Sequence, residues 1–188
     1  GLGYGIIIGA SAVKLPQLVS IIAAKSGKGI LPSMFYMECL MYIISGCYNI
    51  HLNSPFSVYG ENFLLLIQNI IIVGLLWKFQ KDTSFTTKAL ISGGLLTFFL
   101  YLFSDKLVPE GVWQLLMNVQ FLMLVYSRLP QIINNYSVKS TGQLSFLTFF
   151  LNFAGNVARL FTFFKETSDL LNMATAGLSA LFNLTLCL

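Results

Sequence analysis

The chain has 188 residues, of which 56% are hydrophobic and only 10% are charged, and its formal net charge is +4. An ordinary soluble domain is about a quarter charged, so this composition excludes a water-soluble globular protein and indicates one whose solvent is lipid. No basic run interleaves with aromatic residues, which excludes a nucleic-acid site. Cys39, Cys47 and Cys187 lie in apolar stretches without a CxxC pair, so we expect free thiols rather than a metal site or a disulfide.

Apolar stretches separated by polar breaks predict seven transmembrane segments. They cover residues 2–22, 32–52, 57–79, 87–104, 110–132, 145–165 and 170–188. Each is close to the roughly 20 apolar residues with which a helix crosses a bilayer. Because a backbone in lipid must satisfy its own hydrogen bonds, we expect helices. The predicted fold class is therefore an all-α integral membrane protein.

The charges between these segments predict the orientation of the chain. The connections after the first, third and fifth segments and the segment ends beside them hold six lysines and one acid, whereas those after the second, fourth and sixth hold two lysines and four acids. Basic residues favour the cytosolic side of a membrane. We therefore expect a luminal or extracellular N-terminus and a cytosolic C-terminus.

An internal repeat predicts how the seven helices are grouped. Sliding the sequence along itself by 114 residues aligns Lys14-Leu-Pro-Gln17 with Arg128-Leu-Pro-Gln131, and the same offset aligns Asn69 with Asn183. We expect two three-helix units, residues 1–80 and 110–188, joined by a linker helix within 81–109. Equivalent helices then run in parallel (a 3+1+3 arrangement), as in small transporters with a pathway between the halves.

Two Pro-Gln pairs occupy equivalent positions in the predicted repeats, at Pro16-Gln17 and Pro130-Gln131. Proline removes a helical hydrogen bond, so each pair predicts a kink or hinge. The adjacent glutamine offers an amide to a freed backbone group or to a ligand. A static kink with a purely structural glutamine is the alternative interpretation, although the equivalent positions favour a shared mechanical role.

Five charged residues lie inside the apolar segments, away from the segment ends: Lys14, Glu38, Glu61, Arg128 and Arg159. A charge within the bilayer costs a few kcal/mol and usually faces a cavity or a partner. In one interpretation the two acids and three bases neutralise each other as structural pairs. In the other, Lys14, Arg128 and Arg159 hold an anion in a cavity between the repeats.

Amide side chains accompany these charges, namely Gln68, Asn69, Asn152, Asn156 and Asn183. Amides both donate and accept, which suits sugar hydroxyls, so we expect these residues and the two acids to provide polar contacts to a sugar. Interhelical hydrogen bonds are the alternative role. His51, the only histidine, is expected as an interfacial side chain. No catalytic grouping, phosphate-binding loop or acidic metal cluster occurs, so the sequence predicts neither an enzyme nor a cofactor.

Several longer strings strengthen the pattern of the two Pro-Gln pairs: GLGYG at 1–5, VKLPQ at 13–17, PFSVYGE at 55–61, TGQLS at 141–145 and ARLFT at 158–162. With these strings the chain resembles the PQ-loop repeat family, whose relatives include sugar, cystine and KDEL-signal membrane proteins. Within that family it is most similar to the mannose-P-dolichol utilization defect proteins. The resemblance extends over essentially the whole chain.

The resemblance implies a multi-pass protein of the endoplasmic-reticulum membrane. Such proteins are required for the use of dolichol-phosphate-mannose, and of its glucose analogue, as luminal sugar donors for N-glycans, GPI anchors and protein mannosylation. Flipping or presenting the lipid-linked sugar is the implied role. The cations Lys14, Arg128 and Arg159 would then face the phosphate and the amides the sugar.

Two other classes of function remain open at this point. The first is a carrier for a small solute, a sugar or an amino acid, with Glu38 or Glu61 available for proton coupling. The second is a non-transporting subunit that packs against a larger membrane complex, such as one containing a glycosyltransferase.

Overall fold

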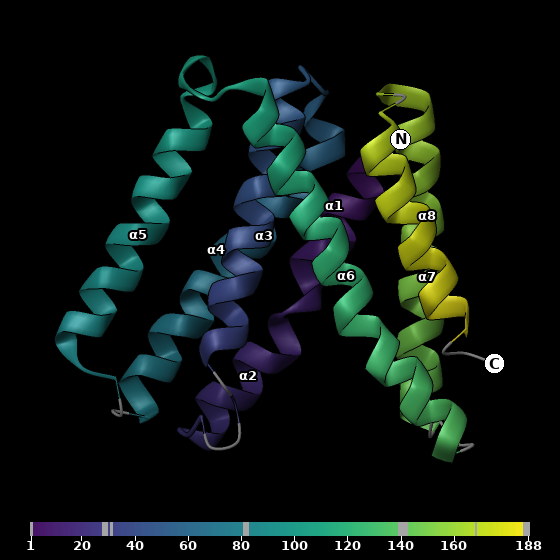
Figure 1. The fold of residues 1–188 in the computed structure, drawn as a ribbon. Coiled ribbons are helices and arrows are strands. Elements are labelled where there is room, and N and C mark those ends of the chain that lie inside the picture. The colour runs from purple at the N-terminus through teal and green to yellow at the C-terminus, as the bar shows by residue number, and fades with distance from the viewer. Residues whose placement is uncertain are drawn as a thin grey trace. The chain divides into compact units, whose positions relative to one another are not determined.

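The computed structural model of the chain describes residues 2–27, 30, 32–80, 83–138, 143–167 and 169–185, without the side chains of 2–3, 10–13, 105, 126–149 and 151. All regular structure in these residues is helical (Figure 1). The helices are α1 (Leu2–Val13), α2 (Leu15–Ala24), α3 (Pro32–His51), α4 (Phe56–Gln80), α5 (Phe85–Phe103), α6 (Glu110–Val138), α7 (Gln143–Glu166) and α8 (Leu170–Thr185), with a 3-10 turn, η1, at Asp105–Leu107.

The prediction of an all-helical protein is confirmed, and each predicted segment coincides with one helix or, for the first segment, with two. Helices α4 and α5 are both long and apolar enough to cross a membrane. Large apolar side chains point outward from several helices, among them Phe85, Leu90, Phe164 and Leu170, each more than two-thirds exposed. In water such a surface would aggregate; in a bilayer it contacts lipid.

The first predicted segment is broken at Lys14, where α1 ends and α2 begins. Pro16 is the second residue of α2, a position where a helix does not need a backbone N–H. The amide of Leu18 closes the first turn by donating to the Lys14 carbonyl at 3.0 Å. Helix α6, by contrast, passes Pro130 without interruption. Of the two predicted hinges, only the one at Pro16 coincides with a helix end.

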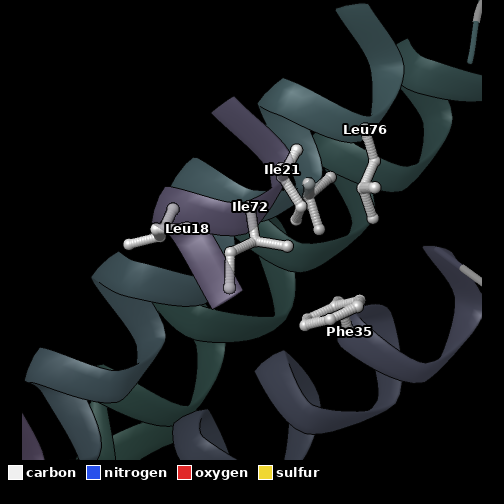
Figure 2. Close-up of a cluster of buried hydrophobic side chains, with 6 residues drawn as sticks. Leu18, Ile21, Phe35, Ile72 and Leu76 are labelled. Carbon is white, nitrogen blue, oxygen red and sulfur yellow. The ribbon is translucent and has the colours of Figure 1, made fainter. Parts of the chain in front are cut away.

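The chain divides into two compact units, and residues 7–113 form the first unit. Helix α3 packs along α4 and α5, and α2 packs on α4. Figure 2 shows the core where α2, α3 and α4 meet: Leu18 and Ile21 from α2, Phe35 from α3, and Ile72 and Leu76 from α4. Because lipid is as apolar as these side chains, van der Waals packing rather than exclusion of water stabilises this contact in a membrane.

One end of this unit is held by hydrogen bonds to the connection after α2. The Nε2 of Gln80 donates to the carbonyls of Gly27 (2.6 Å) and Ile30 (2.8 Å). Gly27 is buried here, and a Cβ at its position would lie 2.6 Å from Cδ2 of Leu76. A larger residue would have to displace Leu76 or Gln80, so Gln80 and Gly27 together hold the connection against α4.

The second unit comprises residues 114–188 together with 1–6. In it, α7 and α8 lie side by side (Figure 1). The carboxylate of Asp169 caps α8 by accepting from the amide of Asn172 at 2.8 Å. Several threonines of α7 and α8 donate their hydroxyl to the carbonyl four residues earlier; they are Thr162, Thr175 and Thr185. These hydroxyls are therefore satisfied within their own helices.

Candidate functional site

Three predicted site residues meet inside the first unit. The Nζ of Lys14 lies 2.6 Å from Oε2 of Glu38, and Nδ2 of Asn69 donates to the same oxygen at 2.8 Å. Lys14 comes from the break between α1 and α2, Glu38 from α3 and Asn69 from α4. We call this group the Lys14 triad.

The triad contains one charge of each sign in a largely shielded place. The Lys14 side chain is 12% exposed and that of Glu38 31%. The ammonium also lies 5.3 Å from the centre of the Phe35 ring, a cation–π contact. The ion pair and the amide hydrogen bond together offset the desolvation of both groups. Of the two roles that the sequence leaves open for Lys14 and Glu38, the geometry therefore favours mutual neutralisation.

The amide nitrogen of Asn69 donates to Glu38, which leaves its amide oxygen, Oδ1, as the other hydrogen-bonding group of the side chain. The residue is fully buried, and among the described residues its Oδ1 has no hydrogen-bond partner. A buried acceptor without a partner costs about 1–3 kcal/mol. Such a group in a native structure needs an explanation, and a ligand hydroxyl is one donor that would satisfy it.

Asn183 repeats this property in the second unit. It is 1% exposed, its Nδ2 donates to the Ser179 carbonyl at 2.8 Å, and its Oδ1 lacks a partner in the part of the chain that the structure describes. Asn69 and Asn183 are the pair that the repeat offset aligns. Each unit thus presents one buried asparagine with an open amide oxygen.

The other predicted site residues have more varied surroundings. Glu61 and Gln68 are buried on α4, and Arg159 and Asn156 are partly buried on α7. Asn152 is exposed, and its carbonyl accepts from Nδ2 of Asn156 at 2.8 Å. Gln17 is partly buried and Pro16 exposed. The side chains of Arg128, Pro130 and Gln131 lie outside the described residues.

The structure also shows a cluster that the sequence did not indicate, around His51 at the end of α3. The His51 Nε2 lies 3.1 Å from Oε2 of Glu110, and its ring stacks on Trp113 at a centroid distance of 5.1 Å. Trp113 is fully buried and also contacts Tyr48. In the sequence, only the presence of Glu110 and Trp113 at the start of the fifth predicted segment could have indicated this cluster. This cluster fixes the beginning of α6 to the end of α3.

Comparison with known proteins identifies the repeats. A model described as PQ loop repeat matches residues 1–58 and 112–172, and each match includes one Pro-Gln pair. Solute carrier family 66 member 3 from Homo sapiens is 24% identical over 160 residues, which cover 85% of this chain and 76% of that protein. No solved structure matches the chain. The two matched repeats and the helical fold show that this chain is a membrane protein of the PQ-loop repeat family.

Proposed function

We propose that this protein of the endoplasmic-reticulum membrane enables the use of dolichol-phosphate-mannose and -glucose as luminal sugar donors. It would do so by flipping or presenting the lipid-linked sugar for N-glycan, GPI-anchor and mannosylation pathways. The human relative is named a solute carrier, and a transporting role in a PQ-loop protein agrees with this proposal. The strings VKLPQ at 13–17 and PFSVYGE at 55–61 support the finer assignment within the family.

The proposal includes the membrane topology. We propose seven spans, with two three-helix repeats (residues 1–80 and 110–188) and a linker containing α5, and the repeat offset of 114 residues supports this arrangement. The excess of lysine in the connections after the first, third and fifth spans supports a luminal N-terminus and a cytosolic C-terminus.

The observation that carries this proposal is the pair of open amide oxygens on Asn69 and Asn183. Both residues are almost fully buried, and the amide nitrogen of each already donates a hydrogen bond. The repeat offset aligns the two residues. An acceptor in that state suits a hydroxyl donor. A hydroxyl-rich ligand such as a hexose offers the donor that an acceptor of this kind lacks.

A liposome assay tests the proposal directly. The full-length protein is reconstituted and the transbilayer movement of a short-chain mannosyl-phosphoryl-polyprenol is measured. We expect protein-dependent movement that falls about tenfold or more in Asn69→Leu and Asn183→Leu, because each loses a hydrogen bond to the sugar while keeping a similar volume. Asn118→Leu, at an exposed position of α6, is the matched control and should behave like the wild type.

Other results would support one of the two alternative classes of function. Uptake of a free sugar or amino acid into vesicles without polyprenyl lipid would support a small-solute carrier, the class to which the name of the human relative points. Absence of any movement with folded protein, together with stable co-purification of a glycosyltransferase, would support a non-transporting subunit instead.

A further inference from the structure

The amide of Asn69 fits its site in two orientations, and its contact with Glu38 distinguishes them. An asparagine amide carries an acceptor oxygen and a donor nitrogen of nearly the same shape. In the Lys14 triad, Nδ2 of Asn69 donates to Oε2 of Glu38 at 2.8 Å. Turning the amide over would bring Oδ1 against the same carboxylate oxygen, and two acceptors would then face each other.

The ion pair with Lys14 excludes this second orientation. The ammonium of Lys14 lies 2.6 Å from the same Oε2 of Glu38. An ionised carboxylate has no hydrogen to donate and only accepts. A facing Oδ1 would therefore lose a charge-assisted hydrogen bond and leave two acceptors in contact. Asn69 must give its nitrogen to Glu38, and Oδ1 becomes the other end of the amide.

This orientation determines what Asn69 offers to a ligand. The residue is fully buried, and its Oδ1 has no hydrogen-bond partner within the described part of the chain. The group on offer is an acceptor, so it is satisfied by a donor such as a hydroxyl. The Glu38 side chain is 31% exposed and that of Lys14 12%, so a ligand approaches the triad from the side of Glu38.

Asn183, which the repeat offset aligns with Asn69, is oriented by a different group. Its Nδ2 donates to the carbonyl of Ser179 at 2.8 Å, four residues earlier on the same helix. A backbone carbonyl also only accepts, so this contact leaves the amide oxygen of Asn183 as the open end. The orientation of Asn183 needs no second helix, whereas that of Asn69 depends on a side chain of α3.

We propose that Glu38, held by Lys14, is a positioning residue that fixes the Asn69 amide, so that the site selects a ligand hydroxyl acting as a donor. Glu38 acts through Asn69 and is not itself a sugar contact. This inference rests on the proposed function for the identity of the ligand. It changes the role that the sequence predicts for Glu38, from contacting the sugar to orienting the residue that does.

The test removes the donor from the ligand. A short-chain mannosyl-phosphoryl-polyprenol is compared with analogues in which fluorine replaces one sugar hydroxyl at a time, because fluorine is small and polar but donates no hydrogen bond. Binding to the purified full-length protein in detergent is measured. We expect the wild type to bind at least one analogue about tenfold or more weakly than the parent lipid. Asn69→Leu should lose this discrimination, which assigns that hydroxyl to Asn69.

Glu38→Gln then tests the positioning role. A glutamine presents both a donor and an acceptor, so the Asn69 amide can face it in either orientation, and we expect the discrimination at the assigned hydroxyl to fall to about threefold or less. Glu38→Asp keeps the carboxylate and should retain the discrimination. Glu110→Gln makes the same chemical change at an acid that is 65% exposed, and it should behave like the wild type.

A double variant covers the case in which Glu38→Gln does not fold, as judged by its thermal unfolding. Lys14→Met combined with Glu38→Gln leaves no lone cation in the interior. Because the amide of Asn69 again faces a glutamine, we expect the same loss of discrimination as in the single variant.

The results separate the inference from the proposed function. Wild-type protein that does not bind the mannosyl lipid contradicts the proposed function itself. Binding by a Glu38→Gln protein that discriminates as sharply as the wild type overturns the inference while the proposed function stands, because a merely structural role would weaken parent lipid and analogue alike. Wild-type protein that binds every analogue as well as the parent, or loss of discrimination in Glu38→Asp or Glu110→Gln, would also overturn it.

Discussion

Contacts between individual side chains are the part of this structure that residue type alone does not predict. Lys14 and Arg128 are both cations that precede a Leu-Pro-Gln string, and residue type alone gives no reason to separate them. The contact of Lys14 with Glu38 joins residues 24 positions apart on different helices, and it depends on the rotation of each helix about its axis. The sequence could therefore name both partners but could not pair them. The same limit applies to His51 and Glu110, which are 59 positions apart.

The buried pair leads to a prediction at the residue scale. Lys14→Met leaves the carboxylate of Glu38 without its cation, and we expect a loss of about 1–3 kcal/mol in unfolding free energy, below the range for a fully buried pair because Glu38 is partly exposed. The double variant with Glu38→Met should recover most of that loss. Thermal unfolding in detergent measures both, and a double variant no more stable than Lys14→Met would contradict the pairing.

At the scale of secondary-structure elements, the sequence predicts where the helices lie but predicts only some of the places where they are interrupted. Long apolar runs bounded by Gly, Pro, Asn and Lys locate the helices because lipid leaves the backbone no other regular choice. The predicted kink at Pro16 appears as a break at Lys14, whereas α6 continues past Pro130. Pro16 lies in the first turn of α2, which needs no backbone N–H at that position, whereas Pro130 lies inside α6 and removes one helical hydrogen bond. Whether the helix ends there depends on what satisfies the freed carbonyl, and the sequence does not contain that information.

The connection after α2 leads to a prediction at the element scale. Gly27→Val places a side chain within 2.6 Å of Leu76 and 2.9 Å of the Gln80 amide nitrogen, so it should displace Gln80 from its two carbonyl acceptors. We expect a loss of about 1–3 kcal/mol in unfolding free energy. Gly74→Ala is the control, because nothing lies within 4 Å of a Cβ there. A Gly27→Val variant as stable as the wild type would show that this end of the unit is not fixed by Gln80.

At the scale of the whole molecule, the positions of the charged residues lead to a prediction about glycosylation in cells. The proposed function predicts that, in cells that lack this protein, the wild-type chain restores N-glycosylation and the surface level of GPI-anchored proteins. We expect the Arg128→Gln and Arg159→Gln double variant to restore both poorly, since it removes the cations of the second repeat from the membrane interior.

The matched control for this rescue removes two lysines near helix ends, Lys25→Gln and Lys78→Gln, and so lowers the net charge equally. Lys25 follows α2 and Lys78 lies in the last turn of α4. Glycan occupancy by gel mobility and GPI-anchored protein by flow cytometry are the two readouts. Full rescue by the arginine variant, or equal failure of the control, would show that the interior position of the charges is unimportant.

The threonines of α7 and α8 have a consequence for how a ligand would travel. The hydroxyls of Thr162, Thr175 and Thr185 donate to carbonyls of their own helices, so these three side chains have no hydroxyl hydrogen left to give to a ligand. An isoprenoid tail in contact with these three side chains would exchange no hydrogen bonds with them. Selectivity among lipid-linked sugars would then depend on the amide and guanidinium groups that are proposed to bind the head group of the lipid.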